Sequence, residues 1–381
     1  AFGSIRLIKA YNRERYEQEQ FERESESYRK KKLRLDMVES LFHPTLNLLI
    51  GISVIIVIWQ GGIMVINDII TVGNIAEFVV YVAYLTWPVT SLGYTVNRFQ
   101  KSLASWERIN QLLEEEVEIQ DDDQTDHEIP EMVGQIEFRN VSFRYPGSDE
   151  YALKDITMTI RPGEHVALVG RTGAGKSTLV QLIPRLFDPT EGQVLLDGVD
   201  LKEWPTDRLR ERIGVVPQET FLFSTTLKEN IAFGADSTDM VEIESAAEKA
   251  QLLENILDFE KKFETMVGER GITLSGGQKQ RTAIARALIK DPDILILDDS
   301  LSAVDTKTEA DIMQHLRKEL ENRTTIMISH RISSIINADT IFYIEDGSLI
   351  ESGSHEELLA LEGHYADMYK KQLLEEELAE I

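Results

Sequence analysis

The stretch "HVALVGRTGAGKSTLVQLIPRLF", residues 165–187, decides the fold of this chain. An apolar run typical of a fully buried strand leads directly into a glycine-rich turn, and the turn leads into a helical pattern. The turn matches G-x-x-x-x-G-K-[ST], a pattern in which backbone N–H groups wrap phosphates. Because the match stands between a strand and a helix, as the motif requires, we predict a nucleotide-binding α/β domain.

The residues expected to bind the nucleotide phosphates follow one another along this turn. In the pattern, the lysine reaches the terminal phosphates and the next hydroxyl binds magnesium. The phosphate-binding set is Gly170, Arg171, Thr172, Gly173, Ala174, Gly175, Lys176, Ser177 and Thr178. A partner acid is expected from "ILILD", residues 294–298, where Asp298 ends a second apolar strand. The motif therefore predicts Ser177 and Asp298 as magnesium ligands, Asp298 through the metal's water shell.

The nucleotide-binding domain is predicted to span residues 135–381 and to end in an acidic tail. It opens with "QIEFRNVSFRY", which alternates apolar and polar residues as a half-buried strand does. From there to about residue 370, strands alternate with helices, which predicts a largely parallel core sheet. A helical subdomain is expected around residues 219–285.

A second glycine-rich turn, "LSGGQ" at residues 274–278, opens a helix of basic and apolar residues. Small residues at a helix start leave backbone N–H groups open to an anion. This turn is thus a candidate second phosphate site, serving another nucleotide or another chain. A plain helix cap explains Ser275 and the glycines almost as well.

Two long apolar segments precede this domain and predict a membrane hairpin. Residues 40–67 carry no Asp, Glu, Lys or Arg, and residues 74–97 carry only Glu77. At about 1.5 Å per residue each is long enough to cross a bilayer, with spans at about 40–66 and 74–98. Basic residues flank the outer ends, which predicts that both ends are cytoplasmic. The alternative is two buried helices of a soluble protein. Glu77 is either a site for a cationic substrate or a solvated acid at the interface.

Composition narrows the class of protein. The chain has 381 residues, of which 42% are hydrophobic, and this excludes a mainly disordered protein. A formal net charge of -26 argues against nucleic acid as the main partner. The chain has no cysteine, so disulfide use does not indicate whether it lies in an oxidising or a reducing compartment. The chain starts with Ala1 inside a charged helical pattern, so we expect a fragment: residues 1–116 as the end of a membrane domain and 117–134 as an acidic linker.

The combination of "LSGGQ", "GRTGAGKST" and "ILILDD" resembles the ATP-binding cassette family. "IRLIKAYNRERYEQEQF" and "LASWERINQLLEEE" are similar to parts of bacterial multidrug-type exporters, in which membrane helices precede one cassette. The resemblance implies an α-helical membrane segment, the last two transmembrane helices of an exporter-type domain, followed by an α/β P-loop cassette with a helical subdomain. It implies a multi-pass protein of the bacterial plasma membrane with its cassette in the cytoplasm, using ATP and Mg²⁺.

The resemblance also implies roles for residues outside the phosphate loop. Tyr145 in "FRYP" would stack on adenine, and Gln218 would contact magnesium and couple the cassette to the membrane domain. His330 would sense the γ-phosphate. The stretch 302–305 would cross a dimer interface, and 267–271 would sense transmembrane coupling. Cassettes of this family pair head to tail, so a nucleotide held by a second chain would be contacted by Ser275, Gly276, Gly277 and Gln278.

Asp299 departs from the family pattern, because efficient ATPases of the family usually carry Glu after the magnesium-binding Asp. The shorter side chain retracts the carboxylate by roughly 1 Å, and a misplacement of that size can lower the rate by about 100-fold. We therefore expect a catalytic set of Asp299, His330 and Gln218 that binds ATP stably but turns it over slowly. The alternative is a tolerated exchange in a working homodimer.

Three hypotheses for function follow. In the first, the chain is an exporter subunit whose partner is a second, non-identical half-transporter with an intact catalytic Glu, and whose substrates are drugs or other amphipathic molecules. "ILILDDSLSAVD" resembles one subunit of such a heterodimeric multidrug exporter. In the second, it is a self-sufficient homodimeric exporter ATPase for lipid or peptide. The third is a soluble ATPase acting on nucleic acid, which residues 40–97 and the acidic charge oppose. Membrane lipid is a further expected partner.

Overall fold

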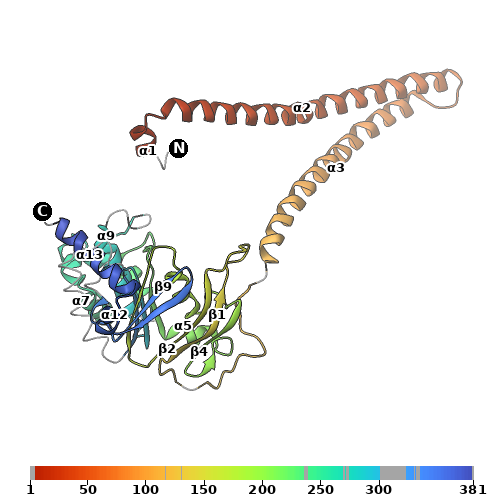
Figure 1. Ribbon diagram of the computed structural model, residues 1–381. Helices are drawn as coiled ribbons and strands as arrows, with labels where there is room; N and C mark the ends of the chain where they lie inside the picture. Colours follow the sequence, from red (N-terminus) through yellow and green to blue (C-terminus); the bar gives the residue numbers. More distant parts are fainter. Residues whose placement is uncertain are drawn as a thin grey trace. The chain divides into compact units, whose positions relative to one another are not determined.

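The computed structural model describes residues 5–115, 117–129, 131–235, 239–268, 271, 274–300, 323–329, 331 and 335–379. The chain divides into two compact units, Ala1–Glu116 and Val117–Ile381. The first unit is helical and the second combines helices with sheets (Figure 1).

The first unit is a hairpin of two long helices. A short helix, α1 (Ile5–Ala10), precedes α2 (Glu14–Ile66) and α3 (Val72–Leu113). Two glycines let α2 and α3 approach closely: an added Cβ would lie 2.8 Å from Ile75 Cγ1 at Gly61 and 3.1 Å from Phe42 Cζ at Gly93. Thr71 starts α3 with a capping box that it shares with Asn74.

The predicted membrane spans lie within these two helices. Each helix is long and apolar enough to cross a bilayer. In the most apolar window, 6% of the α2 residues and 0% of the α3 residues are buried. A buried helix pair of a soluble protein would show the opposite, so burial disfavours that alternative. Within α3, the Tyr81 hydroxyl donates to Glu77 Oε1 at 2.5 Å, so this acid has a partner on its own helix.

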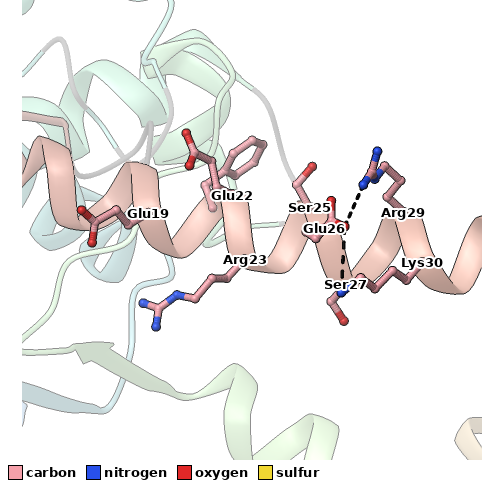
Figure 2. A pocket seen from close by; sticks show the side chains of 9 residues that line it. Glu19, Glu22, Arg23, Ser25, Glu26, Ser27, Arg29 and Lys30 are labelled. Atoms are coloured by element: carbon pink, nitrogen blue, oxygen red, sulfur yellow. Dashed lines mark hydrogen bonds and ion pairs between the residues drawn. The ribbon is translucent and has the colours of Figure 1, made fainter.

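The first half of α2 differs from the second by its charge. Figure 2 shows side chains of this half of α2, among them the acids Glu19, Glu22 and Glu26 and the bases Arg23, Arg29 and Lys30. Glu26 Oε1 accepts a hydrogen bond from Arg29 at 2.8 Å and lies 4.0 Å from Lys30 Nζ. Such pairs support an exposed helix and are weak individually. This half of α2 is therefore suited to water rather than to lipid.

The second unit is built on a six-stranded sheet of order β10-β9-β3-β8-β7-β6. All strands except β10 run parallel. The strands are β3 (His165–Val169), β6 (Ile213–Val216), β7 (Ile294–Asp298), β8 (Thr324–Ile328), β9 (Thr340–Glu345) and β10 (Ser348–Gly353). This confirms the predicted, largely parallel core sheet.

A second, antiparallel sheet has the order β2-β1-β4-β5. Its strands are β1 (Ile136–Phe143), β2 (Leu153–Ile160), β4 (Glu191–Leu196) and β5 (Val199–Asp200). The described helices of this unit are α4 (Lys176–Leu182), α5 (Thr206–Glu211), α6 (Leu227–Ala232), α7 (Met240–Lys249), α8 (Leu253–Asp258), the 3₁₀ turn η2 (Lys262–Glu264), α9 (Gly276–Leu288), α12 (His355–Ala360) and α13 (His364–Ala379).

The parallel sheet is buried on both faces. Alternate residues of β7 show this, since Ile296 packs with α4 and the antiparallel sheet whereas Leu297 packs with α6 to α9. On that second face, β3 and β9 also pack against α12 and α13, as Val169 and Tyr343 show. Strands covered on both faces need apolar side chains throughout, which explains the unbroken apolar runs of β3 and β7.

Two acidic segments are more ordered than their charge suggests. In the predicted linker 117–134, the apolar side chains of Ile129 and Met132 are buried in the core between the two sheets, although acidic residues surround them in the sequence. The linker therefore packs along the second unit at this end. The expected acidic tail is helical up to Ala379, as the second half of α13.

Candidate nucleotide site

The phosphate loop joins β3 to α4, and two of its glycines are required by its shape. Gly170 has φ +142° and an added Cβ would lie 2.0 Å from the carbonyl oxygen of Ile344. Gly175 has φ +101° and its Cβ would lie 2.7 Å from the carbonyl oxygen of Ala152. Any side chain at either position would collide with backbone. The loop is therefore pressed between neighbouring segments.

Lys176 is buried inside this loop. Its side chain is the first of α4, and its Nζ donates to the carbonyl oxygens of Gly170 and Arg171, both at 2.8 Å. Burial lowers the pKa of Lys176, and the carboxylates of Asp298 and Asp299 act in the opposite direction. The ammonium group is thus held by dipoles and faces two acids, a position from which it can neutralise phosphate.

Ser177 and Asp298 meet although they are 121 positions apart in the sequence. Ser177 Oγ donates to Asp298 Oδ1 at 3.1 Å, and the Asp298 residue is 7% exposed. They meet because β3 and β7 are parallel strands of one sheet, so their carboxyl ends share an edge. A hydroxyl and a carboxylate are oxygen ligands of the kind that Mg²⁺ prefers, and Mg²⁺ usually keeps water and phosphate as its other ligands. The residues present therefore fit this metal.

Asp299 follows directly at the same edge. Its φ is +44°, and its backbone N–H donates to the carbonyl oxygen of Ile328 at 2.9 Å. This left-handed conformation at the end of β7 turns the chain out of the sheet. The half-buried Asp299 lies near enough to act electrostatically on Lys176.

Tyr145 lies over the helix that follows the phosphate loop. Its hydroxyl is 2.9 Å from Thr178 Oγ1 and 3.4 Å from Gln181 Oε1. Its ring packs edge-on against Phe143 and Phe187, at centroid distances of 5.0 and 5.4 Å. The ring borders a hollow of 520 Å³ and remains 37% exposed, so an aromatic surface lies beside the phosphate loop.

Gln218 lies two residues beyond β6, the strand beside β7 at the edge of the sheet. Its side chain is exposed. Gln218 thus belongs to the same carboxyl edge as Asp298. The expected contact with magnesium stays a prediction.

The second glycine-rich turn starts α9. Ser275 Oγ accepts from the backbone N–H of Gln278 at 3.2 Å, and Gln278 Oε1 accepts from the N–H of Ser275 at 3.0 Å. Gly276 and Gly277 form the first turn between them. This reciprocal capping box is the plain helix cap considered above. In the described part of the chain, the Ser275 and Gln278 side chains form these hydrogen bonds within the turn. The role of the turn toward another chain stays a prediction.

Several predicted residues lie outside the described part of the chain. They are His330, the stretch 302–305 and, within 267–271, Glu269 and Arg270.

The sequence reasoning missed the turn after β9, where Gly347 N–H donates to the carbonyl oxygen of Ala174 in the phosphate loop at 3.1 Å. The "EDG" after an apolar strand indicates a turn but not its neighbour. Only the order of strands, with β9 beside β3, brings it to the loop.

The phosphate loop, the Ser177–Asp298 pair and the two apolar helices occur in one chain, and comparison with known proteins decides what that combination is. The ABC transporter family model matches residues 153–302, and that of the ABC transporter transmembrane region matches residues 1–89. This chain belongs to the ABC transporter family. It is a helical transmembrane region followed by a cytoplasmic α/β cassette that uses ATP and Mg²⁺, as the motifs predicted.

The relatives include exporters with different names. A probable multidrug resistance ABC transporter ATP-binding/permease protein of Bacillus subtilis is 40% identical over 373 residues, covering 98% of this chain and 63% of the relative. An ATP-dependent lipid A-core flippase of Aromatoleum aromaticum is 38% identical over 375 residues, covering 97% and 61%. A solved structure of a bacterial Atm1-family ABC exporter with ATP bound matches with a TM-score of 0.90 at 33% identity, covering 97% of this chain and 65% of that one. This chain thus spans less than two thirds of these relatives.

Proposed function

We propose that this chain belongs to an ATP-driven ABC exporter subunit, whose cassette hydrolyses ATP to drive export of drugs or other amphipathic molecules across the membrane. The observation that carries the proposal is the convergence of Lys176, Ser177 and Asp298 at one edge of the parallel sheet, on a chain that also holds two apolar helices. The multidrug and lipid flippase relatives support export of amphipathic cargo.

Each residue of the site has a proposed task in ATP binding. The ring of Tyr145 offers a flat surface to adenine, because it is partly exposed and its hydroxyl lies 2.9 Å from Oγ1 of Thr178, the last residue of the phosphate-binding set. Lys176 neutralises the terminal phosphates, and the loop's backbone N–H groups orient them. Ser177, Asp298 and Gln218 would hold Mg²⁺, which when bound would supply charge neutralisation at the phosphates.

Hydrolysis requires a group that orients and polarises water, and we assign this task to Asp299. It lies at the same edge as Lys176 and follows Asp298. Its side chain is one methylene shorter than Glu, which withdraws the carboxylate by roughly 1 Å and lowers the rate by about 100-fold. We therefore propose a degenerate site that binds ATP and hydrolyses it slowly. His330 completes the proposed catalytic set.

A degenerate site fits a partner that is a non-identical half-transporter with a catalytic Glu. We propose that the turn from Ser275 to Gln278 contacts a nucleotide held by the other chain, and its capping box would give the turn a fixed shape before pairing. The second candidate is a self-sufficient homodimeric exporter of lipid or peptide, and the name of the flippase relatives favours lipid as its cargo. In either case we propose that Gln218 and residues 267–271 carry cassette closure to the membrane region.

The two candidates differ in the effect of Asp299→Glu on ATPase activity. The steady-state rate is measured for the unmodified and substituted chains, each alone and each with the presumed partner. We expect Glu to raise turnover by up to about 100-fold if the short acid limits the site. Asp258→Glu, which lengthens an exposed acid at the end of α8, is the matched control and should change nothing. High activity that is equal in both chains without a partner would instead support the homodimer.

A further inference from the structure

The end of β9 and the turn that follows it contact the phosphate loop at two points. At the start of the loop, Gly170 lies so close to Ile344 that an added Cβ would be 2.0 Å from the carbonyl oxygen. Farther along, the Ala174 carbonyl oxygen accepts from Gly347 N–H at 3.1 Å. The loop that is to hold phosphate therefore rests on a turn formed far later in the sequence.

Between these two points, the side chain of Glu345 joins the loop to helix α13. Its Oε1 lies 3.9 Å from Nε of Arg171, and its Oε2 lies 3.0 Å from Nδ1 of His364, the first residue of α13. The three side chains line one hollow of 400 Å³. Glu345 is largely enclosed, with 23% of its side chain exposed, whereas the Arg171 side chain is 83% exposed. When His364 is protonated, the Glu345 carboxylate thus pairs with two cations, the Arg171 guanidinium of the phosphate loop and the His364 imidazolium of α13.

Helix α13 is itself fixed to the same hairpin. Glu351 of β10 accepts from the backbone N–H groups of His364, at 2.6 Å, and Tyr365, at 3.0 Å. Tyr365 is fully buried, and its hydroxyl lies 2.7 Å from Nδ1 of His355. The start of α13 therefore has a set position relative to the turn, and so does the imidazole that meets Glu345.

We infer that Glu345 is a positioning residue for the phosphate loop, and that His364 orients it, so that helix α13 helps to set the affinity of the loop for ATP. The physical link is short. Glu345 restrains Arg171, and the carbonyl oxygens of Gly170 and Arg171 are the two that hold Lys176. Loosening Glu345 changes where Lys176 is presented to phosphate. The inference rests on the proposed ATP binding.

The test measures ATP binding and hydrolysis by the full chain after Glu345→Gln. Binding of ATP with Mg²⁺ is followed by titration calorimetry, and KM and kcat by steady-state ATPase assay. Because the Arg171 contact is solvent-exposed, we expect Kd and KM for ATP to rise by about twofold to fivefold. The value of kcat should stay within about twofold. The loop is expected to bind the phosphates equally in the ground state and in the transition state, and weakening such binding raises KM without lowering kcat. Glu356→Gln, which removes an exposed acid from α12, is the control and should leave Kd unchanged.

Two further variants locate the effect. Arg171→Gln should raise Kd for ATP as Glu345→Gln does, and the double variant should show no additional rise, because both remove one contact. His364→Gln should raise Kd in the unmodified chain and have no effect in the Glu345→Gln chain. Independent, additive effects would overturn the link through Glu345. Arg171→Gln also tests the contact if Glu345→Gln does not fold.

The remaining outcomes separate this inference from the proposed function. If the unmodified chain binds no ATP, the proposed function fails and this inference fails with it. If the unmodified chain binds ATP and the Kd of Glu345→Gln is the same, this inference alone is overturned. A lower thermal midpoint without nucleotide, at unchanged Kd and KM, would show that Glu345 only stabilises α13.

Discussion

Lys176 illustrates how a single residue is prepared for its ligand before the ligand arrives. The pKa of its ammonium group lies below the usual value because the group is buried, and the nearby carboxylates of Asp298 and Asp299 offset part of that effect. The two loop carbonyls that accept its hydrogen bonds prevent the buried charge from being unsatisfied. Added negative charge from phosphate favours the ammonium form further. The residue therefore contributes to binding more than to the stability of the empty cassette.

We expect Lys176→Met to abolish the stabilisation of the cassette by ATP. A ligand that binds only the folded state raises the free energy of unfolding by RT ln(1 + [ATP]/Kd), about 2.7 kcal/mol at a hundredfold excess over Kd. The measurement is the thermal midpoint with and without ATP and Mg²⁺, which should rise for the unmodified chain and stay constant for the variant. Lys202→Met removes an exposed lysine and should keep the ATP-induced rise. An equal rise in the Lys176 variant would exclude this lysine from the site.

At the scale of elements, hydrogen bonds from distant segments complete helices that are poorly capped by their own sequence. Helix α5 begins at Thr206 after Pro205, which provides no side-chain cap. Asp121, 85 positions earlier, accepts instead from the backbone N–H of Thr206 at 3.0 Å. This bond is the main reason that the pKa of Asp121 lies below its usual value. The acidic linker thus has a structural task besides joining two units.

The Asp121 cap predicts a dependence of stability on pH. A carboxyl whose pKa is lowered by folding stabilises the fold above its unfolded pKa, here 3.8, and loses that contribution as pH falls through the lower folded value. We expect Asp121→Ala to lower the free energy of unfolding by about 1 kcal/mol at pH 7, with the difference shrinking below pH 4. Asn retains an acceptor oxygen, so Asp121→Asn should lose less. Urea unfolding of the three chains across this pH range is the measurement, and a pH-independent loss would contradict the cap.

The helical subdomain depends in a similar way on one buried amide. Asn230 of α6 is fully buried. Its Oδ1 accepts hydrogen bonds from the Phe223 N–H at 2.9 Å and from Arg286 of α9 at 2.8 Å. Its Nδ2 donates to the Phe223 carbonyl oxygen at 3.0 Å. Asn230 therefore joins the loop before α6 to α9, the helix that begins at the second glycine-rich turn.

Replacing this amide should destabilise the subdomain strongly. Asn230→Ala removes the side-chain partner of the part-buried Phe223 N–H and carbonyl groups and of Arg286, and we expect a loss of about 2 to 3 kcal/mol in the free energy of unfolding. Denaturant unfolding at constant pH measures it. Ser224→Ala, at an exposed position of the same loop, should cost little. A loss for Asn230→Ala as small as that for Ser224→Ala would show that water replaces the amide.

Across the whole molecule, the sequence predicted what local patterns encode. The phosphate loop, the acid at the end of β7 and the two apolar helices each lie in one continuous stretch, and each has a recognisable spacing. What could not be predicted is pairing between distant strands. Periodicity does not state that β9 lies beside β3, and so the support of the loop by Glu345 and Gly347 was missed. The burial of Ile129 was not predicted for the same reason. The many acidic residues around it make the local sequence hydrophilic on average, although this one apolar side chain packs in the core.

The arrangement of the chain across the membrane is the last prediction, and the absence of cysteine makes it directly testable. Basic residues on the outer ends of the two spans predict that the turn between α2 and α3 lies outside the cell and the charged half of α2 inside. A single cysteine at Asp68→Cys in the turn should react with a membrane-impermeant maleimide in intact cells, whereas Ser25→Cys, shown on α2 in Figure 2, should react only after permeabilisation. The unmodified chain is the blank, because it has no thiol. Reaction of both cysteines in intact cells, or of neither, would contradict a cytoplasmic α2 paired with an external turn, and with it the cytoplasmic cassette on which access to ATP depends.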